Sequence, residues 1–487
     1  MNNSIIKYIL GQVLKVEAVL MLLPTLVSLI YQESEGFSYL ITAALCGGLG
    51  IILSRKKPEN FIFYLKEGCI ATSLSWLFLS FFGSVPFMLT GEIPHIEDAL
   101  FETISGFTTT GASVLSDVEA LSHTSLLWRS FTHWIGGMGV LVFLLAIIPL
   151  SGGSNINLMR AESPGPSVGK LVPKMKYTAR LLYVIYFSLT VLQIILLLLG
   201  NTPLFDSVAI SFGTAGTGGF GIKNDSLAGY SAYVQWVTTI FMVLFGVNFN
   251  AYYFILLKNI KKAFAIEEVR YYFLIILSSI AVIFFNIIGT VKNVGDALLH
   301  SSFQVASIIT TTGYSTIDFN LWPQTSKTIL VILMFIGACA GSTGGGIKVS
   351  RFVILVKTVI KELNSYIHPK SIKKIKIDGK PVEHEVVRSV NVYFITFMII
   401  FSASVLAISF ENKDLITNFT AVAATINNIG PGLEMVGPVE NFGGFNAFSK
   451  FVLMFDMLAG RLELFPLLIL FHPTAWKDMI EKKLRCK

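Results

Sequence analysis

The segments Phe101–Ser113, FETISGFTTTGAS, and Phe303–Ser315, FQVASIITTTGYS, decide the fold that the sequence predicts. In both segments a Thr-Thr-Thr-Gly motif ends ten residues after a phenylalanine, and both lie between long apolar runs. Irregular backbone is tolerated at membrane depth only where it is buried in protein or lines a water-filled cavity. Rings of backbone carbonyl groups form the selectivity filters of ion channels. The repeated motif therefore predicts an ion-selective pore.

The composition indicates an integral membrane protein. The 487-residue chain is 53% hydrophobic and only 14% charged, and its mean hydropathy is +0.68. These values are atypical of a soluble enzyme. The four cysteines are scattered, so we expect free thiols rather than a disulfide framework or a metal site. The first apolar run has no small-residue cleavage site and is expected to be a retained helix.

Ten nearly charge-free stretches are candidate membrane spans. Each has about 17–30 residues, which is enough to cross a hydrocarbon core of about 30 Å. They cover residues 9–31, 37–53, 67–90, 126–150, 178–200, 232–257, 271–291, 327–356, 389–410 and 446–471. An even number of spans places both termini on the same side of the membrane.

The basic residues predict which side that is. With both termini in the cytoplasm, 30 of the 37 lysine and arginine residues lie in or beside cytoplasmic segments, and six lie outside. This asymmetry is a strong positive-inside signal. It explains the net charge of +7 without nucleic-acid binding, and the basic loop 370–388 would meet anionic membrane lipid or a cytosolic partner.

Four short segments between spans carry the candidate filter. Each opens with an aspartate near a turn, at Asp98, Asp206, Asp296 or Asp414, where a carboxylate complements the positive end of a helix dipole. The carbonyl ends of four short pore helices would then point at a common centre and favour a cation. The candidate ion-binding residues are Thr109, Thr110, Gly111, Ala112, Thr217, Gly218, Gly219, Phe220, Thr311, Thr312, Gly313, Tyr314, Asn428, Ile429, Gly430 and Pro431.

We therefore expect an all-α integral membrane protein with four tandem units, each made of helix, pore helix, filter loop and helix. An N-terminal helix pair, residues 1–60, precedes them. The expected units are 61–160, 161–262, 263–365, which contains a gating loop, and 366–487, which ends in a cytoplasmic tail.

The second helix of each unit is irregular below the filter, at residues 134–139, 245–248, 341–346 and 460–461. Four glycines within 341–346 each lose about 1 kcal/mol of helix propensity, which predicts a flexible loop across the ion path. Arg461 is costly inside a bilayer, so it should face the bundle interior, as a barrier to cations or as an anchor for the loop. Pairing with Asp456 or Glu463 is the structural alternative. The candidate gate residues are Gly341, Ser342, Thr343, Gly344, Gly345, Gly346, Lys348 and Arg461.

Six motifs together resemble the TrkH/KtrB/HKT superfamily of potassium transporters over essentially the whole chain. The extra helix pair before residue 60 is similar to the bacterial TrkH branch in particular. The motifs are GFTTTGAS (106–113), GTGGF (216–220), TTTGYST (310–316), GACAGSTGGGIK (337–348), NNIGPGL (427–433) and MLAGRLE (457–463).

The resemblance implies potassium uptake across the bacterial inner membrane, with K⁺ as the transported ion and no organic cofactor on this chain. It also implies a homodimer and cytosolic nucleotide-binding regulatory subunits of the TrkA type. By resemblance, Gly111, Gly219, Gly313 and Gly430 are the filter glycines, residues 337–348 the intramembrane gating loop, and Arg461 the pore arginine.

The same resemblance bears on selectivity. Gly111 favours potassium, since relatives with serine at this position tend to favour sodium. Gly218 and Ile429 stand where the other two repeats have threonine, so the fourfold symmetry is imperfect.

Three alternatives remain open at this stage. The first is a poorly selective or sodium-permeable channel on the same fold. The second is a proton- or sodium-coupled transporter, for which Glu17, Asp456 and Glu463 are the candidate carboxylates. An enzyme is disfavoured, because residues 341–348 depart from a phosphate-binding loop and Arg388 replaces the second histidine of a zinc-protease motif.

Overall fold

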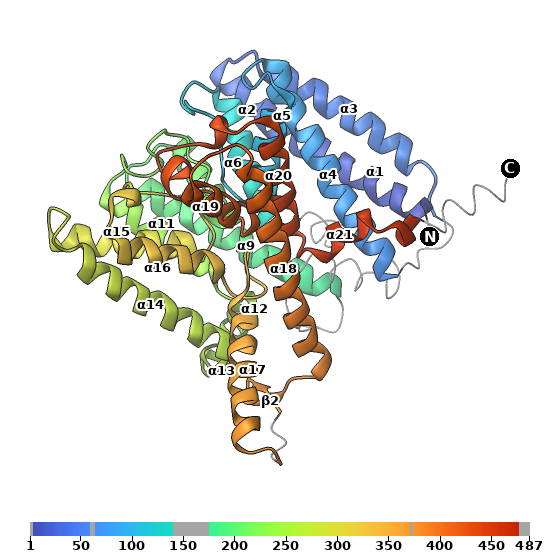
Figure 1. The fold of residues 1–487 in the computed structure, drawn as a ribbon. Coiled ribbons are helices and arrows are strands. Elements are labelled where there is room, and N and C mark those ends of the chain that lie inside the picture. The colour runs from blue at the N-terminus through green and yellow to red at the C-terminus, as the bar shows by residue number, and fades with distance from the viewer. Residues whose placement is uncertain (1–2, 59–63, 140–174, 371–373, 477–487) are drawn as a thin grey trace.

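The computed structural model describes residues 3–58, 64–139, 175–370 and 374–476 (Figure 1). These ranges are mostly helical. A small antiparallel hairpin joins β1 (Lys376–Ile377) to β2 (Lys380–Pro381), with Lys376 opposite Pro381 and Ile377 opposite Lys380. The expected all-α class is confirmed, with this hairpin as a minor addition.

Three helices precede the repeats: α1 (Asn3–Leu20), α2 (Leu22–Tyr31) and α3 (Gly36–Ser54). The first expected span is thus divided at Met21 into α1 and α2. Helix α1 packs closely on α3 because two glycines meet there, and a Cβ atom on Gly11 would lie only 2.8 Å from the carbonyl oxygen of Gly50. Helices α1 and α3 lie beside α4, so the N-terminal helices cover the first repeat (Figure 1).

The remaining helices follow the expected fourfold order. In each repeat a long first helix is followed by a short pore helix, a filter segment and a second helix, and the described residues show this second helix interrupted in the second, third and fourth repeats. The first two repeats contain α4 (Leu65–Thr90), α5 (Ile96–Phe107) and α6 (His123–Gly137), then α9 (Met175–Leu199), α10 (Leu204–Gly216), α11 (Ala232–Gly246) and α12 (Phe249–Leu256). Helix α13 (Ile260–Ala265) leads into the third repeat, which contains α14 (Glu267–Ile287), α15 (Val294–Ile309), α16 (Gln324–Phe335) and α17 (Val349–Ile367). The fourth contains α18 (His384–Ser409), α19 (Leu415–Ile426), α20 (Ala447–Arg461) and α21 (Phe465–Phe471). Single 3₁₀ turns occur at Phe319–Leu321, Glu434–Val436 and Phe442–Gly444.

Six of the ten expected spans are helices long and apolar enough to cross a membrane. A seventh, 232–257, is the pair α11 and α12, which is bent by 93° at Val247–Asn248. The stretches 327–356 and 446–471 are not continuous helices, because each is interrupted where the sequence analysis expected irregular backbone. Helix α6 ends at Gly137, and the rest of the stretch 126–150 lies largely outside the described residues.

The pore helices start differently from the expectation. Only Asp414 caps its helix in the usual way, by accepting a hydrogen bond from the Thr417 amide at 2.8 Å. In α15 the cap is Asn293, and Asp296 lies within the first turn of the helix. The other two aspartates likewise lie in a first turn, where they still complement the helix dipole.

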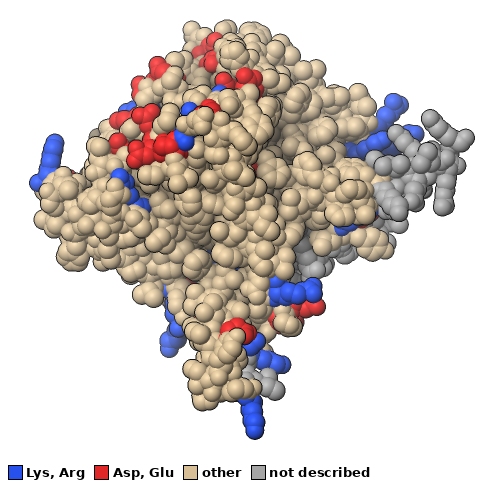
Figure 2. Space-filling model, viewed as in Figure 1, with Lys and Arg blue, Asp and Glu red and all other residues tan. Residues whose placement is uncertain are grey.

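Charged residues are distributed unequally over the surface. Red side chains of aspartate and glutamate gather on the upper left face in Figure 2. Blue side chains of lysine and arginine dominate the lower and right-hand parts of the same view. The segments that follow the filter glycines in sequence carry exposed acidic residues, at Asp117, Glu119, Asp225, Glu434 and Glu440.

Candidate functional site

The four filter segments share one backbone conformation. In each, a non-glycine residue with a left-handed φ of 54–57° is followed two positions later by a glycine with a φ of 76–101°. Left-handed backbone is unfavourable for residues with a Cβ atom, so its repetition at four matching sites marks a constrained structure. The pairs are Thr109 and Gly111, Thr217 and Gly219, Thr311 and Gly313, and Asn428 and Gly430.

Hydrogen bonds back to the pore helix impose this conformation. In every repeat, the amide of the residue before the filter glycine donates to the carbonyl five residues earlier, at 2.8–2.9 Å. This pattern is a left-handed helix end, in which the chain turns over its own last helical turn. The amides are thereby satisfied by the helix. The donors are Thr110, Gly218, Thr312 and Ile429, and the acceptors are Ser105, Gly213, Ser307 and Ala424.

The carbonyl groups of the same four residues form a closed ring. A Cβ atom added to Gly111 would overlap the carbonyl oxygen of Gly218, and one added to Gly219 would overlap that of Thr312. In the same way Gly313 abuts the Ile429 oxygen. A Cβ on Gly430 would lie 2.8 Å from the oxygen of Thr110, which closes the ring. Each filter glycine is therefore required by the carbonyl of the next repeat, a close approach that only glycine allows.

The side chains of the ring positions turn away from this ring. The Thr110 hydroxyl lies 2.8 Å from that of Thr108, and the Thr312 hydroxyl lies 2.7 Å from that of Thr310. Because backbone rather than side chain forms the ring, Ile429 supplies an equivalent carbonyl without a hydroxyl. The departure from threonine in the fourth repeat thus leaves the ring intact.

The other departure, Gly218, has a steric cause. The His133 ring of α6 occupies the space where a side chain at Gly218 would lie. His133 also holds the second filter segment, since its Nε2 accepts from the Phe220 amide at 3.2 Å and its Nδ1 is 2.8 Å from the Gly106 carbonyl. These contacts place the ring proton on Nδ1. The sequence analysis did not identify His133, because only the fold brings it to residues 85 or more positions away.

The residues after the filter glycines pack behind the ring. Ala112, Phe220 and Tyr314 are buried, and the Tyr314 hydroxyl donates to carbonyl oxygens of the second repeat at Ile210 and Phe220, at 3.3 and 3.4 Å. Ala112, Phe220 and Pro431 also border the outer mouth. Ion binding at these four positions stays a prediction.

A buried ion pair that the sequence analysis missed lies behind the first two filters. Arg129 and Glu102 are 2% and 0% exposed, and their charged atoms approach to 2.7 Å. Glu102 also accepts from the Val114 amide, while Arg129 donates to the Gly221 carbonyl at 3.1 Å. A buried pair of this kind is costly to break from one side. In the sequence, the feature that could have indicated this pair is a single charged residue within each of two otherwise apolar segments.

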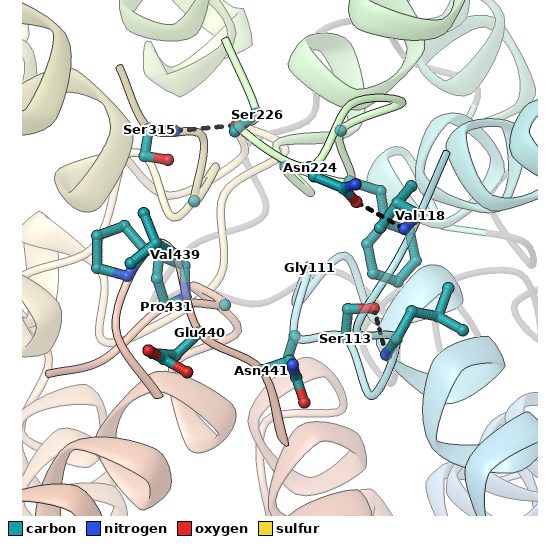
Figure 3. A pocket seen from close by; sticks show the side chains of 18 of the residues that line it. Gly111, Ser113, Val118, Asn224, Ser226, Ser315, Pro431, Val439, Glu440 and Asn441 are labelled. Carbon is teal, nitrogen blue, oxygen red and sulfur yellow. Dashed lines mark hydrogen bonds between the residues drawn. The ribbon is translucent and has the colours of Figure 1, made fainter. Parts of the chain in front are cut away.

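The outer mouth is a cavity of about 170 Å³ above the ring. All four filter glycines border it. Figure 3 shows Pro431, Val439 and Glu440 on one side and Ser113 and Val118 on the other. Glu440, which is exposed, is the carboxylate that borders the mouth.

Below the ring, residues 336–348 form the expected loop between α16 and α17. The Gly345 amide donates to the Thr311 hydroxyl at 2.6 Å, so the loop touches the third filter segment directly. A Cβ on Gly345 would lie 2.7 Å from the Asn427 carbonyl oxygen of the fourth repeat. Thr343 and the three glycines after it are buried. The loop thus lies packed against the inner side of the filter.

The loop is held by the break in the second repeat. The Cys339 amide donates to the Gly246 carbonyl at 3.1 Å, and the Phe249 amide donates to the Gly341 carbonyl at 3.2 Å. Two interrupted helices therefore satisfy each other's free backbone groups, as interrupted helices within a membrane require.

Two cations fix the loop from below. Lys348 is 1% exposed and donates to the Gly345 carbonyl at 3.0 Å and also to that of Gly344. Arg461 donates to the Thr343 carbonyl at 3.0 Å and to the Gly137 carbonyl at 2.8 Å. Arg461 therefore anchors the loop to the end of α6.

The carboxylates considered as partners of Arg461 are bonded elsewhere. Glu463 forms an ion pair with Arg351, and Asp456 accepts a hydrogen bond from Ser404 at 2.7 Å. Of the two expected roles for Arg461, the structure displays the anchor. A barrier role would come from the same charge and remains a prediction.

Four re-entrant units that close a ring of backbone carbonyls define a pore-type membrane transport protein. Residues 38–483 match a family model described as TrkH, cation transport protein. The chain belongs to this family, which consists of transporters rather than enzymes.

Curated relatives and a solved structure agree with this assignment. The chain is 36% identical over 473 residues to the Trk system potassium uptake protein TrkH of Salmonella typhimurium, covering 94% of this chain and 96% of the relative. It is 35% identical to the TrkH protein of Vibrio parahaemolyticus, covering 98% and 99%. The crystal structure of the potassium transporter TrkH from Vibrio parahaemolyticus matches with a TM-score of 0.88 at 32% identity, over 98% of this chain and all of that chain.

Proposed function

We propose that this protein takes up K⁺ across the cell membrane through its own pore, as the ion-conducting subunit of a Trk-type system. The closed ring of carbonyl oxygens from Thr110, Gly218, Thr312 and Ile429 carries the proposal. The relatives named as potassium uptake proteins support K⁺ as the cargo.

The ring would replace part of the hydration shell of a dehydrated cation. The four carbonyl oxygens would face one axis, and the pore helices would direct the negative ends of their dipoles at the same place. In each repeat the amide of the residue that supplies the carbonyl is hydrogen-bonded to its pore helix, which would hold the carbonyl groups in position before the ion arrives. Preorganised carbonyls bind a cation without rearrangement, which suits rapid passage.

The loop 336–348 would be the gate. It is packed beneath Thr311 and is fixed there by Lys348 and Arg461. In this conformation the loop would close the ion path on its inner side. Opening requires these few hydrogen bonds to break together. The five loop glycines, which include Gly337, suit a segment with two conformations.

Assembly and location follow from the same relationship. We place the protein in the bacterial inner membrane with both termini in the cytoplasm, as a homodimer that binds cytosolic nucleotide-binding subunits of the TrkA type. The designation of the relatives as parts of a Trk system supports a multi-component assembly. The charge asymmetry of the chain supports the orientation.

Cation flux into liposomes that contain the purified chain tests the proposal. Without a proton or sodium gradient, we expect uptake of K⁺ and Rb⁺ to exceed that of Na⁺ and Li⁺. Uptake that occurs only with a proton or sodium gradient would contradict the passive pore and indicate coupled transport. Equal uptake of all four ions would contradict the proposal that the pore selects K⁺.

A further inference from the structure

The carboxylate of Glu268, in the first turn of α14, holds three groups from two interrupted helices. Its Oε1 accepts from the Ala340 amide at 2.7 Å and from the Ser350 amide at 3.0 Å. Its Oε2 accepts from the Asn248 side-chain amide at 3.1 Å. Glu268 is only 7% exposed, so these bonds form in a largely dry environment where they are strong.

The positions of these donors define what the carboxylate does. Ala340 precedes the glycine-rich part of the loop and Ser350 follows it, so one side chain fastens both ends. Asn248 begins α12, directly after the bend in the second repeat. Hydrogen bonds to a charged acceptor are about twice as strong as neutral ones. Glu268 therefore ties the loop and the bend to α14 as one unit.

The preceding residue, Glu267, faces the cytosolic hairpin. Its amide donates to the Asp378 carboxylate at 2.7 Å, and the Asp378 amide donates back to the Glu267 carboxylate at 3.3 Å. Lys357 of α17 pairs with Glu267 at 2.5 Å and also donates to the Lys376 carbonyl at 2.7 Å. The turn between β1 and β2 thus caps the start of α14, 111 residues away in sequence.

We propose that Glu268 is a positioning residue for gating, which holds the intramembrane loop closed, and that the Glu267–Asp378 contact sets its position from the cytosolic hairpin. The proposal rests on the gated pore described above. Glu268 bonds to the gating loop, and the adjacent residue Glu267 bonds to the hairpin. A displacement of the hairpin would therefore also displace the carboxylate that holds the loop. Force applied to the hairpin from the cytosol would then release the loop without touching the filter.

The variants Glu268→Gln and Glu268→Ala test the first part in liposomes that contain the full chain and no other protein. Gln keeps one acceptor oxygen but places an NH₂ group against the Asn248 amide, while Ala removes every bond. We expect K⁺ influx to rise about tenfold in the Gln variant, with K⁺ over Na⁺ selectivity unchanged.

Glu17→Gln is the matched control. Glu17 is also a buried glutamate in a membrane helix, at 1% exposure, and its two oxygens have no hydrogen-bond partner among the described residues. We expect wild-type influx for this variant. Unchanged influx in a monodisperse Glu268→Gln protein would overturn the proposal, as would an equal rise in Glu17→Gln.

A double variant separates an effect through the loop from general damage. In a protein that lacks Ser342–Gly346, Glu268→Gln should add no further influx, because the segment that it restrains is gone. An additive rise would overturn the positioning role. Loss of K⁺ selectivity in the loop-deleted protein itself would instead contradict the proposed filter. The role of Glu268 is still decided by the influx of the two variants.

The hairpin contact is tested by Asp378→Ala, with Asp378→Asn as the conservative variant. Asp378 has a φ of 51°, which asparagine tolerates, and Asn keeps an acceptor for the Glu267 amide. We expect Ala to raise influx several-fold and Asn to restore most of the wild-type value. Wild-type influx in the Ala variant would overturn the link to the hairpin.

Discussion

At the scale of the residue, the filter glycines are required for two separable reasons. Gly111 has a φ of 79° and also lies against the Gly218 carbonyl, so a side chain would be strained and would push on the ring. Gly91, at the end of α4, has a φ of 78° but nothing within 4 Å of its would-be Cβ atom. The two positions therefore share the strain and differ only in the contact.

The pair Gly111→Ser and Gly91→Ser should separate these effects. Both variants should lose about 1–2 kcal/mol of stability from left-handed backbone. Only Gly111→Ser should lower the ratio of K⁺ to Na⁺ influx, by roughly tenfold, because displaced carbonyls fit the ion poorly. Liposome flux and thermal unfolding measure the two quantities. Equal K⁺ over Na⁺ selectivity in both variants would contradict the assignment of Gly111 to the filter.

Gly218 and His133 form a second residue-scale pair, because the histidine ring fills the space of the missing side chain. Gly218→Thr alone should be destabilised by about 3 kcal/mol or more through overlap with the ring. Adding His133→Ala should return about 1–3 kcal/mol of this loss, since it vacates the space. Melting temperatures of the four proteins in detergent provide the cycle. Strictly additive losses would show that the two sites are independent.

At the scale of the element, Glu33 joins the N-terminal helices to α6. Its carboxylate accepts from the His123 amide at 2.8 Å and from the Thr124 amide at 2.9 Å. Partial burial by itself raises the pKa of Glu33, but hydrogen bonds from Thr124 and His123 outweigh it and leave the pKa below its ordinary value of 4.5. The charged form is therefore the one that the folded protein binds.

This lowered pKa predicts how stability depends on pH. A carboxylate with a lowered pKa stabilises the folded state above pH 4.5, and that contribution is lost as the pH falls through the native pKa. Glu33→Gln should thus lower the free energy of unfolding by about 1–2 kcal/mol at pH 7. The difference from wild type should shrink towards pH 3, as followed by thermal unfolding in detergent. A difference that is constant with pH would contradict the assignment.

The intramembrane loop is the other element with a direct prediction. Deletion of Ser342–Gly346 removes the backbone that lies beneath Thr311 and the carbonyls that bind Lys348 and Arg461. We expect K⁺ influx in the absence of any partner to rise by at least tenfold. Liposome flux on monodisperse protein measures it. Influx at or below the wild-type value would exclude the loop as the gate.

At the scale of the whole molecule, the sequence predicts more of the architecture than of the contacts. Apolar runs, aspartates near the pore helices and the four glycine motifs predicted the repeats and the fold class, because each depends on a local pattern. The ten continuous spans were only partly right, since the break between α11 and α12 and the loop between α16 and α17 satisfy each other's free backbone groups only in the folded structure.

The supporting residues could not be predicted for the same reason. His133, Glu102 and Glu268 bond to residues between 11 and 87 positions away, so no local pattern shows their partners. The sequence shows an unusual polar residue in an apolar segment, and the fold alone shows what it binds. In the sequence, Gly218 only breaks the fourfold pattern. In the folded protein the His133 ring fills the space that a side chain at this position would need.

The acidic outer face gives the molecule an electrostatic preference that one residue can test. Glu440 is exposed and borders the mouth in Figure 3, where its charge concentrates cations above the ring. Glu440→Gln should lower K⁺ influx by roughly twofold at low ionic strength and leave it unchanged near 1 M salt, where the screening length is about 3 Å. Glu35→Gln removes a charge before α3, outside the residues that line the mouth, and should have no such effect. An effect of Glu440→Gln that persists in high salt would mean that the side chain shapes the mouth rather than its potential.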